Sequence, residues 1–350
     1  MTGGDHVRRF PLVRGENDSG FCALVGGCPS FAEIVRRARV LARGDSPILL
    51  LGETGVGKEV FARAIHEGSG RQGAPFVALN CGGLPRELLA SDLFGYAEGA
   101  FTGARRTGCV GKIEAAHGGT LFLDEVSEMP LDLQPYLLRV LEGGEIYPLG
   151  TSKARVVHFR LVAACNRDLR ADVHAGRFRA DLFYRISVTS LRLPALRDRY
   201  DDLPVLVAHF ARQAAERQGV PVRRFAPDVL LLFARHTWPG NLRELRNVVE
   251  AMVLEADGAV VGRDALPPDF PSPVEGSPPA DLAGPRPLGD LEREVIQSTL
   301  HLHLGNLTRA AKDLGISRST LYLKVKRYGL HPTLDQIRMG AAIGARSPAL

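Results

Sequence analysis

A glycine-rich stretch is the clearest chemical feature of the chain: Gly52, Glu53, Thr54, Gly55, Val56, Gly57, Lys58 and Glu59. Residues 47–51 before it have the pattern of a strand buried on both faces, and residues 60–65 after it have a helical pattern. Strand, glycine loop and helix in this order are typical of a P-loop, whose backbone N–H groups surround nucleotide phosphates. We expect Lys58 to reach the β- and γ-phosphates. The alternative is a glycine-rich loop that arose by chance.

Two adjacent carboxylates, Asp124 and Glu125, end an apolar run further along the chain. A strand that ends in such a pair after a P-loop is typical of a Walker B motif. We expect Asp124 to bind Mg²⁺ directly or through water, and Glu125 to polarise the water that attacks the γ-phosphate. The P-loop residue that is commonly Ser or Thr and binds Mg²⁺ is Glu59 here, which leaves the metal to Asp124. Taken alone, the pattern also fits a strand capped by a solvated acidic turn.

Two further strand-like segments, residues 76–80 and 160–166, each end in an asparagine, Asn80 and Asn166. A polar side chain at the carboxyl end of a strand in an open α/β sheet points into the crevice where ligands bind. Both are candidates for the nucleotide site, although a turn-capping role fits Asn80 equally well. The strands and the helical segments between them predict an α/β fold with a parallel sheet flanked by helices.

A small hexapeptide lies between the P-loop and the acidic strand end: Gly99, Ala100, Phe101, Thr102, Gly103 and Ala104. Two glycines and two alanines around one aromatic residue predict a loop tip with an apolar point. An ordinary surface loop is the alternative for these residues taken alone. Neither Phe101 nor Thr102 would be needed to bind a nucleotide.

Inside a nucleotide-binding domain, the intact GAFTGA hexapeptide closely resembles the signature of the sigma-54-dependent transcriptional activators, bacterial enhancer-binding proteins of the AAA+ class. The resemblance covers residues 24–330 and implies a P-loop NTPase with a helical lid and a small all-α helix-turn-helix domain. It implies ATP and Mg²⁺ as cofactors, and it makes Glu59 a family trait, because GETGxGKE is common there. The hexapeptide is then the part that contacts sigma factor, with Phe101 and Thr102 foremost.

The resemblance also implies roles for single residues around the nucleotide. Asn80 stands in the family's FxxxNC segment, where an asparagine is thought to hold the catalytic glutamate until the γ-phosphate is sensed. Asn166 matches a sensor segment, usually AATNRDL, in which this chain has Cys165 in place of threonine. Arg243 matches the second sensor arginine, which is expected to contact the phosphates. Asn166 and Arg243 therefore join the P-loop residues as the expected ATP-binding set.

Two arginines six positions apart, Arg179 and Arg185, match the family pattern FRxDLxxR of trans-acting arginine fingers. By that resemblance each reaches the γ-phosphate bound to a neighbouring subunit and offsets charge there. Taken alone, they would be charges on a helix surface. The resemblance implies that the subunits form a ring, expected to be a hexamer. The expected catalytic residues are Lys58, Asp124, Glu125, Asn80, Arg179 and Arg185.

The second half of the chain is predicted to be helical. Residues 193–199 (LPALRDR) indicate a linker, and amphipathic segments follow at 203–213, at 228–235 and after the Pro239-Gly240 break. By the resemblance these segments form the AAA+ lid. A run rich in Pro, Gly and Ser then predicts a semi-rigid linker over residues 263–288.

The last predicted module is a three-helix domain that begins with a helix over residues 291–304. In the second helix, apolar residues recur at i, i+3, i+4 and i+7 from Leu307, and Ser317 can cap a third helix that runs to Tyr328. Basic residues outnumber the single acid Asp313, which is typical of a duplex binder. The stretch NLTRAAKDLGISRSTLYLKVKRYGL resembles the Fis-type helix-turn-helix, which binds DNA as a dimer with its third helix in the major groove. The expected DNA contacts are Arg309, Ser317, Arg318, Ser319, Thr320, Tyr322, Lys324, Lys326 and Arg327.

These observations predict six parts: a short disordered leader (1–22), the α/β ATPase subdomain (23–196), the lid (197–262), the linker (263–288), the helix-turn-helix (289–330) and a tail (331–350). Members of the family usually carry a regulatory domain before the ATPase. The leader has no room for one, since independent domains rarely fall below ~50 residues. We therefore expect control by a partner in trans, by expression level, or none.

The composition of the 350 residues, 45% hydrophobic and 24% charged, is that of an ordinary soluble globular protein. The net charge of +5 permits a polyanionic partner without requiring one. The five cysteines are scattered without metal-binding spacing and predict reduced thiols. No apolar run approaches the ~18–20 residues that a membrane span needs, so we expect a cytoplasmic protein without membrane contact.

Together these features predict an activator that binds DNA upstream of a promoter and hydrolyses ATP in a ring to convert the closed sigma-54 RNA polymerase complex into an open one. Two other classes remain open. A DNA-binding regulator whose ATPase domain no longer remodels sigma factor predicts that Phe101→Ala leaves regulation unchanged. A nucleic-acid motor or chaperone-type AAA+ protein predicts ATPase activity stimulated by single strands or unfolded protein, without site-specific duplex binding by residues 289–330.

The sensor segment yields a first prediction. Cys165→Thr restores the hydroxyl that the family usually has near the nucleotide, so we expect faster ATP turnover. Steady-state ATPase assays at saturating ATP measure this, and unchanged turnover would remove the idea.

Overall fold

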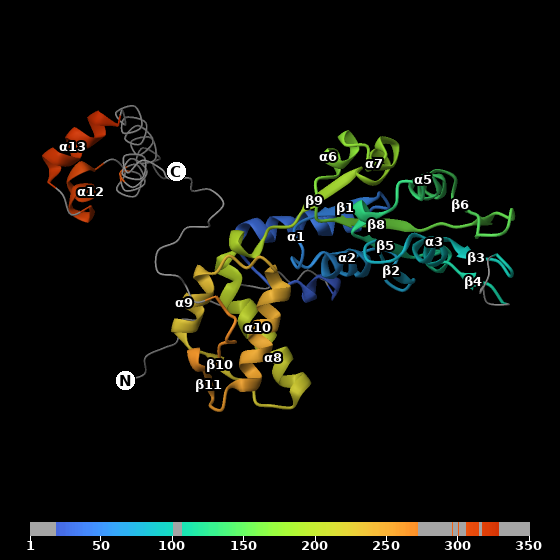
Figure 1. The fold of residues 1–350 in the computed structure, drawn as a ribbon. Coiled ribbons are helices and arrows are strands. Elements are labelled where there is room, and N and C mark those ends of the chain that lie inside the picture. The colour runs from blue at the N-terminus through green and yellow to red at the C-terminus, as the bar shows by residue number, and fades with distance from the viewer. Residues whose placement is uncertain are drawn as a thin grey trace, which may run out of the picture. The chain divides into compact units, whose positions relative to one another are not determined.

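The computed structural model describes residues 19–100, 107–271, 296, 300, 306–314 and 317–328. The chain divides into two compact units, residues 1–273 and residues 274–350, each of which is described by itself (Figure 1). The first unit contains the P-loop and the acidic strand end, and the second contains the expected helix-turn-helix.

A five-stranded parallel sheet lies at the centre of the first unit, in the strand order β2-β5-β8-β1-β9. Its strands are β1 (Ile48–Leu51), β2 (Phe76–Asn80), β5 (Thr120–Asp124), β8 (Arg160–Cys165) and β9 (Thr189–Arg192). Asn80 pairs with Asp124 in the register, and Leu51, the last residue before the P-loop, pairs with Cys165. Because the strands are parallel, their carboxyl ends meet at one edge, and the polar strand ends gather there as predicted.

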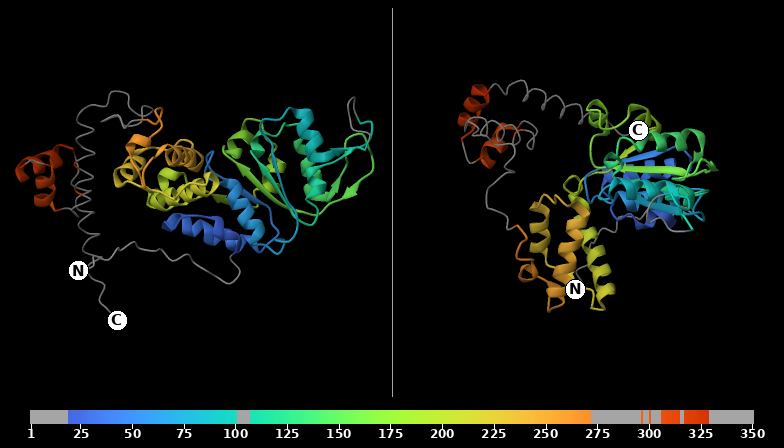
Figure 2. Two further views of the ribbon diagram at one scale, coloured as in Figure 1. Left: turned by 90° about the horizontal axis from the view of Figure 1, so that it is seen from below. Right: turned by 45° about the vertical axis from the view of Figure 1, so that its right-hand side comes forward.

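Helices cover both faces of the sheet (Figure 2). On one face lie α1 (Pro29–Ala42) and α2 (Lys58–Glu67). On the other lie α3 (Arg86–Phe94), α4 (Lys112–Ala115), α5 (Gln134–Gly143), α6 (Leu169–His174) and α7 (Ala180–Ile186). All residues of β8 are buried, because both of its faces are covered, and this accounts for apolar runs without alternation. The predicted α/β P-loop NTPase fold is confirmed.

Two short antiparallel pairs extend beyond α3 and α5: β3 (Gly95–Tyr96) with β4 (Cys109–Val110), and β6 (Glu145–Ile146) with β7 (Arg155–Val156) (Figure 1). The hexapeptide lies between β3 and β4. Gly99 and Ala100 belong to the described residues, whereas Phe101, Thr102, Gly103 and Ala104 lie outside them.

The lid consists of α8 (Leu203–Gln218), α9 (Pro227–Arg235) and α10 (Asn241–Glu255), with the short parallel pair β10 (Arg224–Phe225) and β11 (Val260–Val261). The 3₁₀ turn η5 (Arg263–Ala265) follows. The lid has a hydrophobic core of its own, separate from the two cores that flank the sheet. This core is centred on Trp238, which is fully buried and lies edge-on to the ring of Phe233. The predicted helical lid is confirmed.

The linker expected over residues 263–288 is wrong at its start, because Ala265 and Phe270 are buried in the core of the lid. Two other expectations about connecting segments are also wrong. Residues 193–199, expected to be a linker, are a packed junction that contains the 3₁₀ turn η3 (Leu196–Asp198), in which Leu196 is buried. A second such turn, η4 (Tyr200–Asp202), leads into α8. At the other end, η1 (Ser19–Ala23) buries Phe21 in the core around α2, so these residues belong to the folded unit and not to a disordered leader. Turn-forming residues indicate backbone shape but not burial, which explains both errors.

In the second unit the described helices are α12 (Leu307–Asp313) and α13 (Arg318–Arg327). The residues that the helical spacing places inward form one buried cluster: Ile296, Leu300, Leu307, Ala310, Ala311, Leu321 and Val325. The Thr320 N–H donates a hydrogen bond to the Ser317 hydroxyl oxygen (N–O distance 3.0 Å), as expected of a helix cap. Most of the expected helix over 291–304 lies outside the described residues. Within the described part of the chain, no helix is long and apolar enough to cross a membrane.

Candidate nucleotide-binding site

The P-loop is closed by its own lysine. The side chain of Lys58 is buried at the first turn of α2, and its Nζ donates hydrogen bonds to the carbonyl oxygens of Gly52 (2.8 Å) and Glu53 (3.0 Å). Gly57, which precedes the helix, has φ 96°, a conformation that side chains with a Cβ rarely adopt. The loop therefore presents its backbone N–H groups and the positive end of α2 to the same space, as phosphate binding requires.

Lys58 interacts electrostatically with the acidic strand end. Burial lowers the pKa of the Lys58 ammonium, and the charges of Asp124, Cys165 and Glu125 raise it in turn. The positive charge of Arg243, in the lid, lowers the pKa of Lys58, as burial does. Lys58, the two carboxylates at the end of β5 and Arg243 thus share one electrostatic environment.

Asp124 and Glu125 differ in conformation. Asp124 ends β5 with regular backbone, and its Oδ1 accepts a hydrogen bond from the Glu125 N–H (2.9 Å). Glu125 has φ 51°, in the left-handed region that is uncommon for residues other than glycine. This conformation turns its carboxylate toward Gly82, where an added Cβ would collide with Glu125 Oε2. The Gly82 N–H in turn donates to Asn80 Oδ1 (2.7 Å). Since a Cβ at Gly82 would also lie 3.3 Å from Asn80 Oδ1, Asn80 and Glu125 both adjoin Gly82 and are close to each other.

Glu59 is turned away from the phosphate side of the loop. Its carboxylate forms an ion pair with Arg63 one turn further along α2 (2.7 Å), and both side chains are about half exposed. Among the described residues, no cluster of three His, Cys, Asp or Glu side chains could hold a metal ion. A magnesium ion needs no such cage, since it commonly takes one or two carboxylates together with substrate phosphates. Asp124 fits that requirement.

The sensor segment contacts the P-loop through its asparagine. Asn166 Nδ2 donates to Thr54 Oγ1 (3.3 Å). Cys165, just before it, is fully buried in the sheet core, and its Sγ accepts from the Arg167 N–H (3.3 Å) and donates to the Arg167 carbonyl (3.2 Å). The thiol thus stabilises the turn that follows the strand.

The lid holds the P-loop through Asn241, which is fully buried. Its Nδ2 donates to Glu53 Oε2 and to the Thr54 carbonyl (both 3.1 Å), and its Oδ1 accepts from the Leu196 N–H (2.8 Å). The next residue, Leu242, donates its N–H to the Gly55 carbonyl (3.0 Å). At Gly55, φ is 79° and an added Cβ would collide with the carbonyl of Gly240, so the lid and loop backbones touch.

Arg197 completes this contact from the junction before the lid. It forms an ion pair with Glu53, and the Arg197 hydrogen bonds, followed by that of Asn241, lower the pKa of the Glu53 carboxyl group. The sequence analysis missed Arg197 and Asn241. The Pro239-Gly240 break could have indicated that Asn241 opens a helix, but no local pattern could place its amide against the P-loop.

Arg243 lies two residues after Asn241 and is exposed. It lines a cavity of about 420 Å³ with Thr54 of the P-loop, Gly240 and, from the end of the first unit, Pro267 and Phe270. The expected second sensor arginine is therefore next to the phosphate-binding loop.

A second cavity, of about 340 Å³, opens where the P-loop becomes α2. The P-loop contributes Val56 and Gly57, the lid contributes Phe210 and Leu242, and the segment before α1 contributes Val25. Its size and largely apolar walls suit a small aromatic group. The P-loop motif indicated Val56 and Gly57 in the sequence, whereas Val25, Phe210 and Leu242 belong to no motif and could not be selected there.

The two expected arginine fingers do not reach the P-loop of their own chain. Arg179 is exposed at the start of α7 and pairs with Asp181 (2.7 Å). Arg185 is exposed and donates to the Leu141 carbonyl (2.6 Å). Both guanidinium groups are available at the surface.

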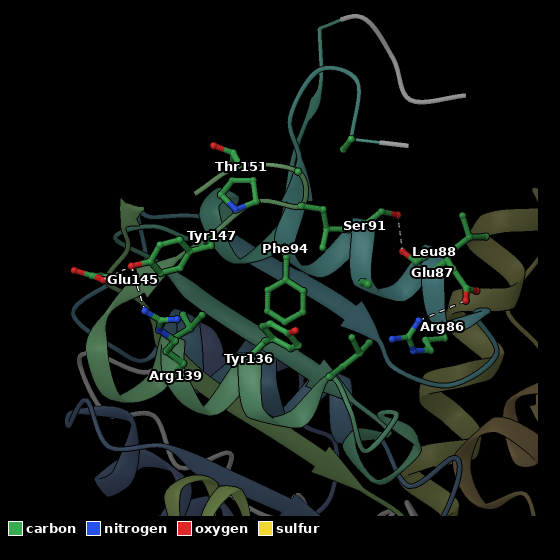
Figure 3. Close-up of a pocket in the computed structure, with 17 residues that line it drawn as sticks. Arg86, Glu87, Leu88, Ser91, Phe94, Tyr136, Arg139, Glu145, Tyr147 and Thr151 are labelled. Atoms are coloured by element: carbon green, nitrogen blue, oxygen red, sulfur yellow. Dashed lines mark hydrogen bonds and ion pairs between the residues drawn. The ribbon is translucent and has the colours of Figure 1, made fainter. Parts of the chain in front are cut away.

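The base of the hexapeptide adjoins a third cavity, of about 680 Å³ (Figure 3). Phe94 of α3 and Tyr136 of α5 lie edge-to-face in it, and Ala100 lines it as well. The arm that leads into the hexapeptide is hydrogen-bonded to Leu149: the Ala97 N–H donates to the Leu149 carbonyl, and the Leu149 N–H donates to the Gly95 carbonyl (both 2.9 Å). Movement of the segment after β6 would therefore be transmitted to the arm.

In the second unit, most of the expected DNA contacts are at the surface. The exposed ones are Arg309, Ser317, Arg318, Ser319, Thr320, Tyr322 and Lys326, and Lys324 is partly exposed. The side chain of Arg327 lies outside the described part of the structure.

The sheet, the P-loop and the lid together define a P-loop ATPase of the AAA+ class. Models of three families match consecutive parts of the chain: the sigma-54 interaction domain over residues 24–192, the AAA+ ATPase lid domain over 197–281, and the Fis family of bacterial regulatory proteins over 287–328.

Two curated proteins are similar to this chain over most of its length. A limonene hydroxylase of Geobacillus stearothermophilus is 46% identical over 333 residues, which cover 93% of this chain and 61% of that protein. The transcriptional regulatory protein GlrR of Escherichia coli (strain K12) is 41% identical over 308 residues, which cover 88% of this chain and 68% of GlrR. The chain thus spans only part of the length of the curated relatives it matches.

A solved structure is also similar. The crystal structure of NtrX from Brucella abortus in complex with ADP matches with a TM-score of 0.68 and 34% identity, over 87% of this chain and 70% of that one. The chain belongs to the sigma-54-dependent transcriptional activators, and it contains their AAA+ ATPase domain, lid and Fis-type helix-turn-helix.

The contact between lid and P-loop generates a prediction. Asn241→Ala removes the amide that is hydrogen-bonded to Glu53, Thr54 and Leu196. Because the P-loop then loses these hydrogen bonds, we expect the affinity for ATP to fall about tenfold, which corresponds to about 1.4 kcal/mol of binding free energy. Isothermal titration calorimetry with ATP measures this. Glu250→Ala, which removes a half-exposed ion pair with Arg217 in the same lid, is the control and should bind ATP normally. An Asn241→Ala protein that is less stable but binds ATP unchanged would contradict the expectation.

Proposed function

We propose that the chain hydrolyses ATP at the edge of the sheet where the strands end. The observation that carries this proposal is the convergence of Lys58, Asp124, Asn166 and Arg243 on one P-loop. Lys58 and the loop N–H groups bind the phosphates, and Asp124 holds a Mg²⁺ ion that would neutralise phosphate charge. Glu125 orients the attacking water, and Asn80, across Gly82, holds Glu125 until the γ-phosphate is in place.

The adenine base occupies the cavity of about 340 Å³ at the start of α2. A triphosphate held by the P-loop directs its nucleoside toward Gly57, and this cavity opens there. Its apolar walls from Val56, Phe210 and Leu242 suit the faces of a purine.

The hydrolytic site is completed by a second subunit. Arg179 and Arg185 are exposed on the side of α7 and do not reach their own P-loop, so they act on the nucleotide of a neighbour. Assembly into a ring, with ATP at each interface, follows from this arrangement. A hexamer is the ring size that the family resemblance favours.

Hydrolysis moves the hexapeptide Gly99–Ala104 and thereby opens the closed complex of sigma-54 RNA polymerase. The double hydrogen bond of Leu149 to the arm at Gly95 and Ala97 supports this step, because it gives the segment after β6 a direct connection to the loop. Phe101 and Thr102 make the contact with sigma factor.

The helix-turn-helix brings the ring to DNA upstream of the promoter. The exposed basic residues of α12 and α13 support this role, with α13 in the major groove. A regulatory partner acting in trans is one of the three alternatives for control that the sequence leaves open, and the cytoplasm is the compartment that contains both polymerase and promoter.

Open-complex formation tests the remodelling step. We expect the purified protein, at a concentration that dispenses with the upstream site, to convert sigma-54 polymerase on a promoter that uses it into an open complex when ATP is present. Phe101→Ala should hydrolyse ATP but lose opening, because Phe101 is not needed to bind nucleotide. Footprinting of single-stranded promoter DNA measures the opening.

The matched control for that experiment is Val110→Ala, which shortens an exposed apolar side chain on β4 of the same pair. It should open the promoter as the unaltered protein does. Opening by Phe101→Ala at the unaltered rate would contradict the role of the hexapeptide.

A mixing experiment tests the arginine fingers. Lys58→Ala and Arg179→Ala should each lose nearly all ATPase activity alone. Mixed in equal amounts, they should recover about a quarter of it, because one interface in four then joins an intact P-loop to an intact finger.

A mixture of Lys58→Ala with Glu125→Gln is the control for the fingers. Both residues belong to the same half of the site, so no interface is intact and no activity should return. Recovery in this control, or none in the first mixture, would contradict a finger supplied by the neighbour.

A further inference from the structure

A buried ion pair stands at the junction between sheet and lid. Arg199 precedes η4 and Asp202 is its last residue. The Arg199 Nε and Asp202 Oδ2 atoms lie 3.2 Å apart, and the two side chains are only 3% and 5% exposed. Burying two charges is costly unless further hydrogen bonds satisfy them. The partners of this pair therefore indicate what it does.

Among the described residues, the further side-chain hydrogen bonds and the cation–π contact of the pair go to one segment, residues 25–31. Asp202 Oδ1 accepts hydrogen bonds from the Gly27 and Cys28 N–H groups (2.6 and 2.9 Å). Arg199 Nη2 donates to the Val25 carbonyl (2.7 Å), and the guanidinium lies 3.8 Å from the centre of the Phe31 ring. The two charges together hold a short piece of chain that precedes the sheet.

This segment has little structure of its own. Residues 24–28 connect η1 to α1 without forming a helix or strand. Gly26 has φ +146°, and a Cβ there would lie 2.6 Å from Asp202 Oδ2 and 2.7 Å from Arg199 Nη2. The backbone at Gly26 packs directly against the ion pair and leaves no space for a side chain at this position.

The same segment forms one wall of the 340 Å³ cavity beside the P-loop. Leu24 and Val25 line that cavity together with Phe31 and Arg199. Its other walls come from α2, α8 and α10, which are regular helices with their own hydrogen bonds. The wall at residues 24–28 depends on Arg199 and Asp202 instead.

We propose that Arg199 and Asp202 are a positioning pair that sets the nucleoside-binding wall against the lid. This proposal rests on the ATP site of the proposed function. It adds that the phosphates and the nucleoside are bound by different parts of that site. The P-loop binds the phosphates without help from the pair, whereas the base and ribose bind well only when the pair holds residues 24–28. Nucleoside binding is thereby coupled to the start of the lid.

The test compares two ligands on the full chain, ADP and inorganic tripolyphosphate, by isothermal titration calorimetry. Asp202→Ala should weaken ADP binding about tenfold and leave tripolyphosphate affinity within about twofold, because only ADP has a nucleoside. Asp202→Asn retains an oxygen for the Gly27 and Cys28 N–H groups and should lose less affinity for ADP. A loss of affinity for ADP alone indicates that the pair positions the nucleoside-binding wall, because a general loss of structure would weaken the binding of both ligands.

A second variant keeps both charges. Gly26→Ala displaces the wall by contact with the pair and should show the same selective loss for ADP, even if Asp202→Ala fails to fold. Glu250→Ala is the control, since it removes an ion pair on the lid surface that touches no cavity wall. It should bind both ligands normally.

Two results would overturn the proposal: equal weakening of ADP and tripolyphosphate in these variants, or ADP affinity unchanged in both Asp202→Ala and Gly26→Ala. Failure of the ATP site itself would look different. The unaltered protein would then bind neither ligand, and Lys58→Ala would change nothing.

Discussion

The hydrogen bonds that shape the P-loop come from two sides, and the rest of the site depends on both. Lys58 closes the loop from within, and Asn241 supports it from the lid through Glu53 and Thr54. Since Asn241 also binds the Leu196 N–H, the loop, the junction and the lid form one hydrogen-bonded unit. The lid is thus joined to the proposed phosphate-binding loop by direct hydrogen bonds.

The parallel sheet supplies the other constraint. Its register sets Asn80 beside Asp124, and the left-handed backbone of Glu125 turns the second carboxylate toward Asn80. A left-handed backbone is uncommon for a residue other than glycine, and it persists only where the surrounding structure holds it in place. Arg179 and Arg185 are bound to Asp181 and to the Leu141 carbonyl instead of to their own P-loop, which is compatible with the proposed action on a neighbouring subunit.

Much of the site could be predicted because its residues stand in continuous motifs. P-loop, acidic pair, strand-end asparagines and Arg243 are each fixed to one end of one strand or helix, and a parallel sheet brings such ends to one edge. The lid contacts of Asn241 and Arg197 could not be predicted, because they join positions more than 140 residues apart. The same reason hid the junction at residues 193–199, whose Leu-Pro pattern indicates a turn whether it is buried or exposed.

The sequence by itself determined the fold class, the order of the modules and the phosphate chemistry, since strand and helix periods and glycine conformations are local properties. Only the tertiary structure decided what supports that chemistry. It places a carboxylate and a guanidinium, Asp202 and Arg199, in the interior against residues 24–28, and it turns Glu59 outward to Arg63. Which side chains are buried, and which groups they contact, depends on the packing of the whole chain, so a local sequence pattern does not indicate either.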